Sequence, residues 1–400
     1  MIGTARVPDR LSAGSGLRRL CIAGGGTGGH LMPGLALAER ARERFPGVEV
    51  TFFRTRRAVE DQVFAGQEGG GPGGLAVREL DLPPPGRTPP AWARFLRRCL
   101  VAERMIRREL RRSRPEVLVA LGGYPSLPGI IAAKRQGIPV VLLEQNRSPG
   151  KVVRRFSRWA TAVACPDGEA AARILAGRHE SFARRGPRVV VTGNPVRRAI
   201  LEAMDARASR RARPARRPEE PRTVIVLGGS QGSRGINRAI REALPALRGL
   251  EKKLSWIHLA GNADKDAMVE AYRSAGFEAR VHAYSNQVPA FLAQADLAIA
   301  RAGGTTVSEL AAVGVPAVLV PYPHHADRHQ FHNAEALVDS GAARLCPEEE
   351  LGPERIAAVL RELLFDDARL AVMEEAALSL ARPEAADLVL DLLLQVSGAA

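Results

Sequence analysis

The segment CIAGGGTGGHLMPGLALAERA, residues 21–41, has the pattern of a buried strand, a glycine-rich turn and the first turns of a helix. Three of its glycines, Gly24, Gly26 and Gly29, fit the G-x-G-x-x-G spacing that holds the pyrophosphate of a dinucleotide. A second segment of the same form, IVLGGSQGSRG, occupies residues 225–235. Two such segments in a chain of 400 residues predict an α/β protein with two Rossmann-like domains in tandem.

Apolar runs rich in Val, Ile and Leu alternate with helical patterns along the whole chain, which indicates βαβ units and parallel sheets buried on both faces. The strands predicted in the first half are 18–23, 48–53, 75–80, 116–123, 140–145, 160–165 and 188–193. Those predicted in the second half are 223–229, 254–261, 278–284, 297–304, 317–323 and 342–346.

The domain boundaries follow from shifts in composition. We predict a disordered leader at 1–17, an N-terminal domain at 18–196 and a C-terminal domain at 197–380. The Arg- and Pro-rich stretch 205–222 has almost no apolar residue, so we predict a flexible insert that contributes nothing to a core. The last segment, 381–400, is predicted to be a helix that packs back on the first domain.

The formal net charge of +15 and the sequence pI near 10.7 suit a nucleic-acid binder as well as a protein that meets an anionic membrane. Only five of the 58 basic residues are lysine, so part of the excess reflects a bias toward arginine. The N-terminus has no apolar signal region, and no window approaches the roughly 18 apolar residues of a spanning helix. The four cysteines lie far apart without a C-x-x-C pair, which favours a reduced, cytoplasmic protein without structural zinc.

A dinucleotide site needs an acidic residue about 20 positions after the glycine turn to hold a ribose. Here the strand 48–53 is followed by Arg54, Thr55, Arg56 and Arg57, so the carboxylate is missing, although arginines suit a 2′-phosphate. Neither glycine run continues into Gly-Lys-Ser or Gly-Lys-Thr, which excludes a P-loop. The two turns therefore predict phosphate binding without identifying the ligand.

Four further polar patches follow predicted strands, where ligands bind in open α/β sheets. They are GGYPSLPG (122–129), LEQNRSPG (143–150), TGNPVR (192–197) and the long stretch 300–334. In the last of these a helix is predicted to start near Thr305, capped by Thr305 or Thr306, with Glu309 in its first turns. A carboxylate there can bind two ribose hydroxyls while the free N–H groups of the helix face a diphosphate.

In this order the segments GGGTGGH, GGYPS, LEQN, GNPVR, LGGSQGSRGIN and RAGGTTVSELAAVGVPAVLVPYP resemble the MurG family of peptidoglycan N-acetylglucosaminyltransferases over roughly residues 18–395. The resemblance implies a GT-B fold, in which the parallel sheets of two Rossmann-like domains face each other across a cleft. It also implies inverting transfer of GlcNAc from UDP-GlcNAc to the 4-hydroxyl of undecaprenyl-diphosphate-MurNAc-pentapeptide. No cofactor and no nucleic acid are expected.

The resemblance assigns site residues by their place in these motifs. Donor contacts fall on Thr27, Gly28, Gly29, Asn146, Arg197, Ser230, Gly304, Thr305, Thr306, Glu309 and Gln330. By this analogy Glu309 binds the uridine ribose, Ser230 and the helix end near Thr305 bind the diphosphate, and Gln330 holds the sugar. Ser285 and His329 also fall at the donor site but depart from the family pattern. Residues on the acceptor side are Gly25, Gly26, Gly122, Gly123, Tyr124, Glu144 and Gln145.

An inverting transfer needs one base to take the acceptor proton and a polar cradle for the departing UDP. His30 closes the first glycine turn and is the candidate general base. The alternative is a histidine that hydrogen-bonds the loop or the acceptor diphosphate without taking a proton. The resemblance places His324, His325, Asp327 and His329 beside the donor sugar, and we predict no metal site.

Residues 89–115 show a helical pattern in which apolar residues alternate with nine arginines from Arg94 to Arg114. A basic amphipathic helix of this kind can lie on anionic lipid. Our hypothesis is an apolar stripe that packs inward and a basic rim that faces lipid; the membrane-facing residues are Trp92, Phe95, Arg97, Arg98, Arg107 and Arg108. We therefore expect a peripheral protein on the cytoplasmic face of the bacterial plasma membrane.

Three alternatives remain open at the level of the sequence. One is another GT-B transferase that uses a different nucleotide sugar or glycolipid acceptor, because a fold does not specify its substrate. A second is a basic nucleic-acid-binding protein that uses the arginines of 205–222. A third is a dinucleotide oxidoreductase.

Overall fold

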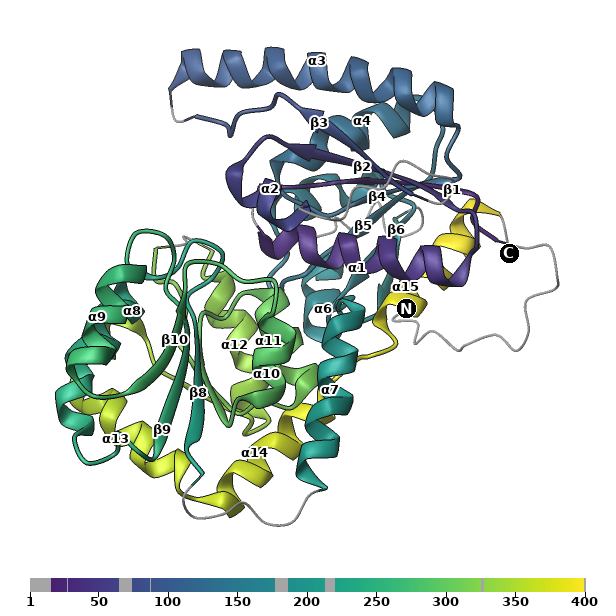
Figure 1. The fold of residues 1–400 in the computed structure, drawn as a ribbon. Coiled ribbons are helices and arrows are strands. Elements are labelled where there is room, and N and C mark those ends of the chain that lie inside the picture. The colour runs from purple at the N-terminus through teal and green to yellow at the C-terminus, as the bar shows by residue number, and fades with distance from the viewer. Residues whose placement is uncertain are drawn as a thin grey trace. The chain divides into compact units, whose positions relative to one another are not determined.

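A computed structural model describes residues 16–26, 28–64, 74–86, 88–176, 186–212, 220–324 and 327–398. The chain forms two compact units, one of residues 1–197 with 382–400 and the other of residues 198–381 (Figure 1). Most of the predicted leader lies outside the described residues. Its last residue, Leu17, is buried in the core of the first unit, so the leader was predicted to extend too far.

The first unit contains a seven-stranded parallel sheet in the order β3-β2-β1-β4-β5-β6-β7. Its strands are β1 (Arg19–Ala23), β2 (Glu49–Thr55), β3 (Leu75–Leu80), β4 (Val117–Ala120), β5 (Val140–Leu143), β6 (Ala162–Cys165) and β7 (Arg188–Val191). One face is covered by α1 (Gly28–Arg44), α2 (Ala58–Phe64) and α15 (Ala385–Ser397). The other face is covered by α3 (Pro89–Ser113), α4 (Leu127–Arg135), α5 (Lys151–Phe156) and α6 (Gly168–Ala176).

The second unit contains a six-stranded parallel sheet in the order β10-β9-β8-β11-β12-β13. Its strands are β8 (Arg222–Leu227), β9 (Leu254–Leu259), β10 (Glu278–His282), β11 (Leu297–Ala300), β12 (Ala317–Leu319) and β13 (Ala343–Leu345). Helices α8 (Arg234–Ala243), α9 (Lys265–Ser274) and α13 (Pro353–Leu364) share one core with the sheet. The remaining helices are α7 (Arg198–Arg211), α10 (Val288–Gln294), α11 (Gly304–Val313), α12 (His329–Asp339) and α14 (Asp367–Ser379).

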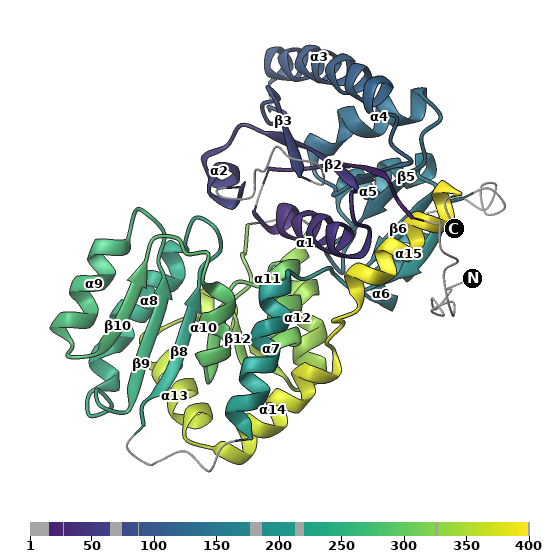
Figure 2. The ribbon, with the colours of Figure 1, turned by 45° about the vertical axis from the view of Figure 1, so that its right-hand side comes forward.

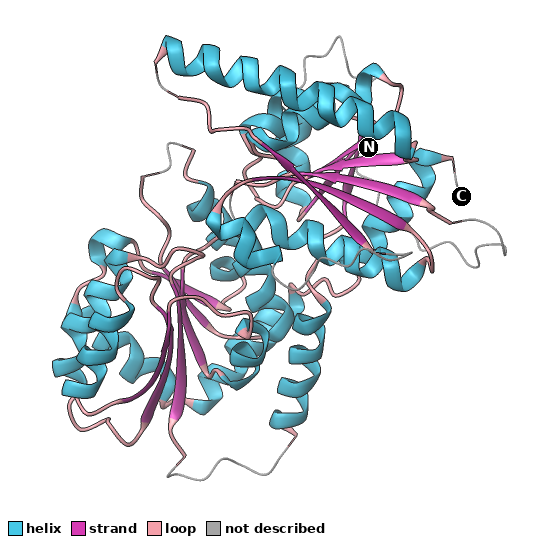
Figure 3. Cartoon of the chain, turned by 45° about the horizontal axis from the view of Figure 1, so that its top comes forward, coloured by secondary structure: helices cyan, strands magenta, loops and turns pink. Residues whose placement is uncertain are grey.

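All thirteen predicted strands are present, and the predicted α/β class with two Rossmann-like domains is confirmed. Figure 3 shows helices on both faces of each set of strands. Strands such as β4 and β5 are apolar throughout because both of their faces are buried. Several predicted strands run too long, such as 297–304, which ends at Ala300 because the glycines that follow leave the sheet and lead into α11, whereas 75–80 is exact and 48–53 continues to Thr55.

In each sheet the strand order reverses direction once, beside β1 in the first unit and beside β8 in the second. The glycine turn of each unit follows that strand. In the first unit β1 pairs with β2 on one side and β4 on the other; Ile22 is opposite Phe52 and Val119. In the second unit β8 lies in the same way between β9 and β11. Ligands bind at the carboxyl ends of the strands at such a switch point, so each unit places its glycine turn where an anion can be held.

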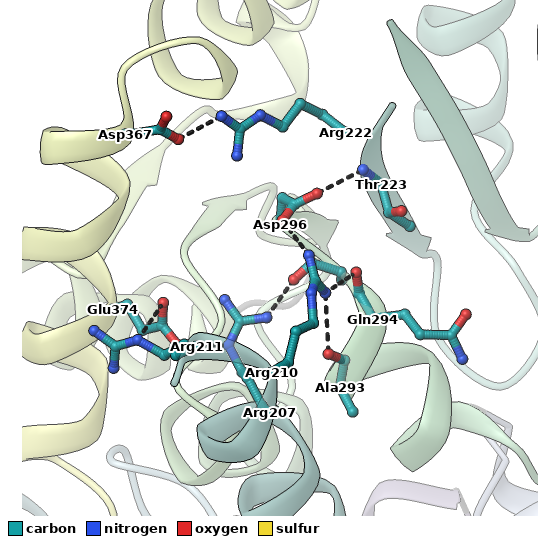
Figure 4. A network of polar contacts seen from close by, with 11 residues as sticks. Arg207, Arg210, Arg211, Arg222, Thr223, Ala293, Gln294, Asp296, Asp367 and Glu374 are labelled. Carbon is teal, nitrogen blue, oxygen red and sulfur yellow. Dashed lines mark hydrogen bonds and ion pairs between the residues drawn. The ribbon is translucent and has the colours of Figure 1, made fainter. Parts of the chain in front are cut away.

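The predicted flexible insert 205–222 is contradicted at both of its ends. Residues 205–211 continue helix α7, and Arg222 begins β8, while residues 213–219 lie outside the described part of the chain. Arg207 is buried, because its guanidinium donates to Glu374 and to the carbonyl oxygen of Ala295 (Figure 4). The first part of this arginine-rich stretch therefore belongs to the folded second unit, and ion pairing with Glu374 holds it there.

The chain ends on the first unit, where α15 lies beside α1 (Figures 1 and 2). Apolar residues of α15, including Val389 and Leu393, join the core of that unit. On the outer side of the contact, Arg40 and Arg44 of α1 donate to the Asp387 carboxylate at 3.0 and 3.4 Å. The C-terminal helix is thereby an integral layer of the N-terminal unit.

His258 on β9 lies in a fully buried polar cluster of the second unit. Asn237 donates through its amide nitrogen to Ala260 and Asp264, so its oxygen accepts from His258 Nε2 at 2.9 Å. The Tyr272 hydroxyl then donates to Nδ1 at 3.0 Å. Protonation of Nδ1 reverses this last hydrogen bond, so that Tyr272 must accept, and it buries a charge. Burial accordingly lowers the pKa of His258 to about 3.

This cluster predicts a loss of stability in mild acid. The unfolded chain takes up the proton near the ordinary histidine pKa of about 6.5, well before the folded chain, so unfolding becomes more favourable as pH falls through that value. Between pH 7 and pH 5 the His258 contribution to the free energy of unfolding falls by on the order of 2 kcal/mol. Urea titrations of wild type and His258→Gln at both pH values test it. The difference in free energy of unfolding between the two proteins is expected to change by that amount between pH 7 and pH 5. A difference that stays constant rules out His258 as the source of the pH dependence.

Candidate active site

The first glycine turn is held by a buried carboxylate beneath it. The Gly26 N–H donates to Glu60 Oε1 at 2.7 Å, and the Thr55 hydroxyl donates to the same oxygen. Glu60 is 0% exposed, and burial raises its pKa above the ordinary value, against the lowering effect of these hydrogen bonds. Gly26 has φ +94°, which a residue with a Cβ rarely adopts, so the turn requires glycine at this position.

Arg57 closes the other side of this turn. Its Nη1 donates to the Gly26 carbonyl oxygen at 2.7 Å, and its guanidinium stacks over the Tyr124 ring at 5.7 Å. Arg54, in contrast, is buried and paired with Asp61 and Glu79 at 2.6 and 2.7 Å. Because its charge is already compensated, Arg54 does not fit the 2′-phosphate site that the dinucleotide alternative requires.

His30 and the LEQN segment meet at the carboxyl end of the sheet. His30, in the first turn of α1, places Nδ1 2.8 Å from Oε1 of Gln145, which follows β5. The glycine pair Gly122 and Gly123 and the short helix η1 (Tyr124–Ser126) follow β4; a Cβ on Gly123 would lie 3.8 Å from the His30 ring. The structure thus brings together His30, Gln145 and the GGYPS turn, which the sequence analysis had assigned to one site.

Glu144 organises the loop after β5. This buried carboxylate accepts from the Asn146 N–H at 2.8 Å, from Asn146 Nδ2 at 3.0 Å and from the Gly150 N–H at 2.8 Å. These hydrogen bonds are internal to the loop, and through them Glu144 positions Asn146. Arg197 lies in the segment that leads from β7 into α7, at the end of the first unit.

The predicted donor residues Gly28 and Gly29 form the start of α1, beside the same turn. Gly25, assigned to the acceptor side, precedes Gly26 in that turn. Thr27 lies outside the described residues.

In the second unit the glycine turn after β8 leads into α8. Ser233 is the N-cap of α8 and accepts from the Ile236 N–H at 3.3 Å, while Ser230 lies exposed in the turn. Gly232 has φ +77°, and a Cβ there would lie 2.1 Å from the Ala260 carbonyl oxygen, so only glycine fits. The turn is therefore packed tightly on its sheet side and open at Ser230.

Arg301 links this turn to the loop after β12, a connection that the sequence analysis did not assign. The buried guanidinium donates to Ser233 Oγ at 2.7 Å, to the Val320 carbonyl at 3.1 Å and to the Pro321 carbonyl at 3.2 Å, and it pairs with Glu348. The sequence signal was an arginine two residues before the glycine pair that leads into α11.

Helix α11 carries four of the predicted donor residues, Gly304, Thr305, Thr306 and Glu309. Its N-cap is Gly303, which makes no side-chain cap hydrogen bond, so the predicted capping by Thr305 or Thr306 is wrong. Both threonines instead lie inside the first turn. Glu309 is buried in the second turn of the helix, past the first turn in which the predicted capping was placed.

Of the other predicted donor residues in the second unit, Ser285 lies in the loop before α10, and His329 and Gln330 are the first two residues of α12. The Gln330 side chain accepts from the Tyr322 N–H at 2.9 Å, and His329 Nε2 is 2.7 Å from Asp327 Oδ2. Ser285 Oγ accepts from the Gln287 N–H at 3.0 Å. His325 lies outside the described residues. Among those that are described, no group of three or more His, Cys, Asp or Glu residues is arranged to hold a metal ion.

The surface of α3 departs from the predicted arrangement. Phe95 is 2% exposed and packs edge-on against Tyr124, so it does not face a membrane. Trp92, Leu96, Leu100 and Met105 are instead exposed, each by 40% or more. One apolar face of the helix lies in the core with Phe95, Cys99 and Ile106, and Trp92, Leu96 and Leu100, at i, i+4 and i+8, form an exposed apolar stripe, whereas Met105 is exposed on another side.

The arginines of α3 surround its exposed apolar face. Arg97 and Arg108 are exposed, Arg98 pairs with Asp81 at 2.6 Å, and Arg107 lies 3.7 Å from Glu103. No helix in the described part of the chain is both long and apolar enough to cross a membrane.

Comparison with known proteins agrees with this architecture. Residues 20–165 match the glycosyltransferase family 28 N-terminal domain, and residues 223–389 match its C-terminal domain. With two parallel-sheet Rossmann-like domains and a glycine turn at each switch point, the protein is a GT-B glycosyltransferase.

Individual relatives identify the family more narrowly than the domain models do. UDP-N-acetylglucosamine–N-acetylmuramyl-(pentapeptide) pyrophosphoryl-undecaprenol N-acetylglucosamine transferase of Pelobacter propionicus is 35% identical over 94% of this chain and 99% of its own length. The enzyme of the same name from Myxococcus xanthus is 37% identical over 96% and 95%. The crystal structure of Acinetobacter baumannii MurG has a TM-score of 0.69 and 26% identity, covering 94% of this chain and 99% of that one. The chain belongs to this family, the MurG transferases, and the predicted resemblance is confirmed.

Proposed function

We propose that the protein transfers GlcNAc from UDP-GlcNAc to the 4-hydroxyl of undecaprenyl-diphosphate-MurNAc-pentapeptide, with inversion at the anomeric carbon. The observation that carries this proposal is the end-to-end similarity to transferases of that name, with both glycine turns kept at the switch points. The product is the lipid-linked disaccharide from which peptidoglycan is built.

The donor half of the reaction belongs to the second unit. Gly304, Thr305 and Thr306 form the N-terminus of α11, and a helix N-terminus suits a diphosphate because its dipole favours negative charge. Ser230 in the open part of the glycine turn adds a hydroxyl donor. Glu309 binds the ribose, while Gln330, His329 and Ser285 lie toward the sugar and uracil. These donors stabilise the negative charge that develops on the departing UDP.

The acceptor half belongs to the first unit. The turn of Gly25 and Gly26, with Gly122, Gly123 and Tyr124 beside it, faces the acceptor diphosphate and its sugar. His30 takes the proton of the attacking hydroxyl, since it is the titratable group at the end of this turn. By the family resemblance Thr27, Gly28, Gly29, Asn146 and Arg197 contact the donor from this unit.

A transfer assay tests the proposed function. Radiolabelled UDP-GlcNAc and a short-chain MurNAc-pentapeptide diphosphate lipid are expected to give a labelled disaccharide lipid. UDP-GalNAc and UDP-glucose serve as matched donors that separate this enzyme from other GT-B transferases. Failure to form product from UDP-GlcNAc refutes the proposal.

We further propose that the exposed face of α3 docks on the cytoplasmic surface of the plasma membrane, where the lipid acceptor is held. Apolar side chains at i, i+4 and i+8 (Trp92, Leu96 and Leu100) can enter the lipid interface while Arg97 and Arg108 meet anionic headgroups. Each basic residue near such a surface contributes about 1 kcal/mol.

Substitution on this face is expected to weaken membrane binding without unfolding the protein. The double variant Leu96→Ser/Leu100→Ser loses about 1 kcal/mol of apolar burial in lipid per residue, hence ~10-fold or more in affinity for vesicles of anionic lipid. Val372→Ser, at an exposed valine of α14, is the matched control and keeps wild-type binding. Equal co-sedimentation of all three proteins, or indifference to anionic lipid, excludes the docking face.

A further inference from the structure

Gln145 is fixed at three points. Its side-chain Nε2 donates to the Leu143 carbonyl oxygen at 2.7 Å, and its Oε1 lies 2.8 Å from His30 Nδ1. Its own carbonyl oxygen accepts from Nδ2 of Asn194, also buried, at 2.9 Å. Only 3% of Gln145 is exposed, so both ends of its amide are occupied within the protein.

These contacts determine where His30 carries its proton. The Leu143 carbonyl can only accept, so the NH₂ end of the Gln145 amide must face it. The oxygen end then faces His30 and can only accept, so His30 Nδ1 must donate. The reverse orientation of the amide places two acceptors 2.7 Å apart and loses this hydrogen bond.

We infer that Gln145 is a positioning residue that holds neutral His30 in the Nδ1–H tautomer, with the lone pair on Nε2. The inference rests on the proposed function and deepens it, because it names the basic atom. Nε2 makes no hydrogen bond to any described residue. Gln145 therefore acts through His30 and does not contact the acceptor itself.

The proton then moves in one balanced step. The acceptor 4-hydroxyl oxygen bonds to the anomeric carbon of GlcNAc as its proton passes to Nε2. The bond between that carbon and the UDP oxygen breaks, and its electron pair leaves with UDP. The imidazolium that forms keeps its Nδ1–H donated to Gln145 Oε1, which stabilises the positive charge, and it later returns the extra proton to water.

A neutral histidine without such a partner favours the opposite tautomer, with its proton on Nε2 and no lone pair there. Gln145→Leu keeps the approximate size of the side chain but removes both hydrogen bonds. We expect His30 to shift mainly to the Nε2–H form and kcat to fall by about tenfold, a fraction of the loss of the base itself. The KM for UDP-GlcNAc is expected to stay unchanged, because the donor residues are untouched.

Nitrogen-15 NMR of the histidine-labelled full-length protein at neutral pH tests this directly. The His30 signals are assigned by their disappearance in His30→Ala, and long-range proton–nitrogen couplings show which nitrogen is protonated. Wild type is expected to show Nδ1–H and Gln145→Leu mainly Nε2–H. Gln136→Leu is the matched control, since Gln136 also donates to a backbone carbonyl, that of Arg107, but away from His30.

Two results overturn the inference: a proton on Nε2 in the wild type, or the same tautomer in wild type and Gln145→Leu. If Gln145→Leu changes the His30 tautomer but leaves kcat unchanged, the tautomer has no effect on catalysis, and the inference is overturned as well. The spectrum reports the tautomer whether or not GlcNAc is transferred. Failure of the transfer assay with an Nδ1–H spectrum refutes the proposed function alone.

Discussion

Replacing His30 by alanine is expected to lower kcat for GlcNAc transfer by at least ~100-fold, the effect typical of a lost general base. In the proposed mechanism two described carboxylates of the first unit do not compete for the hydroxyl proton, since Glu144 is engaged by Asn146 and Gly150 and Glu60 lies beneath the glycine turn. Because the imidazole reaches Gln145 but is not part of the sheet core, the fold is expected to survive the change.

The measurement is steady-state transfer to the short-chain acceptor, with UDP-GlcNAc binding followed by calorimetry. Donor affinity is expected to remain within about twofold, because the proposed nucleotide site lies in the second unit. His332→Ala serves as the control: His332 pairs with Glu335 on α12 and lies outside the proposed catalytic set. Turnover of His30→Ala near that of wild type rules out His30 as the base and favours a histidine that only hydrogen-bonds the loop or acceptor.

Removing Glu374 is expected to destabilise the second unit by about 3 kcal/mol or more, as breaking a buried ion pair does. Glu374 Oε1 accepts from Arg207 Nε at 2.6 Å, and Oε2 lies 3.5 Å from Arg211 Nε. The Glu374→Ala change leaves the Arg207 guanidinium buried, with the Ala295 carbonyl as its one remaining acceptor among the described residues (Figure 4). The nearby pair of Arg210 and Asp296, at 2.6 Å, remains.

Urea unfolding, with hydrogen exchange of β8 and β11 to assign the transition to the second unit, measures this effect. Glu270→Ala is the control, because Glu270 pairs with Arg273 at a comparable 2.7 Å but on the exposed surface of α9; its midpoint is expected to match wild type. The double variant Arg207→Met/Glu374→Met is expected to recover most of the loss, since it leaves no buried charge unpaired and Arg211 is partly exposed to water. A Glu374→Ala protein as stable as wild type contradicts the assignment.

The sequence predicts the fold well because its signals are local. Continuous apolar runs mark strands that are buried on both faces, and all thirteen are found. The backbone has a positive φ at Gly26 and at Gly232. Residues with a Cβ rarely adopt such an angle, so glycine in the sequence marks each turn. The motif order around these turns also indicates the family, which the relatives confirm.

Features that depend on distant partners were not predictable from local patterns. The Arg-rich stretch before 213 has the composition of a flexible insert, yet Arg207 is buried because Glu374 lies opposite it, 167 residues later. On α3 both Phe95 and Leu96 belong to apolar sets at helical spacing. Only packing against Tyr124 decides that Phe95 is in the core and Leu96 is in solvent.

The candidate site shows the same division. The sequence by itself determined that this protein has two Rossmann-like domains, two phosphate-type glycine turns and a histidine at the first of them. The tertiary structure alone decided that Glu60 supports that turn and that Gln145, 115 residues from His30, fixes its proton. Hydrogen bonds of this kind form between side chains that the sheet brings together, and no pattern of neighbouring residues encodes them.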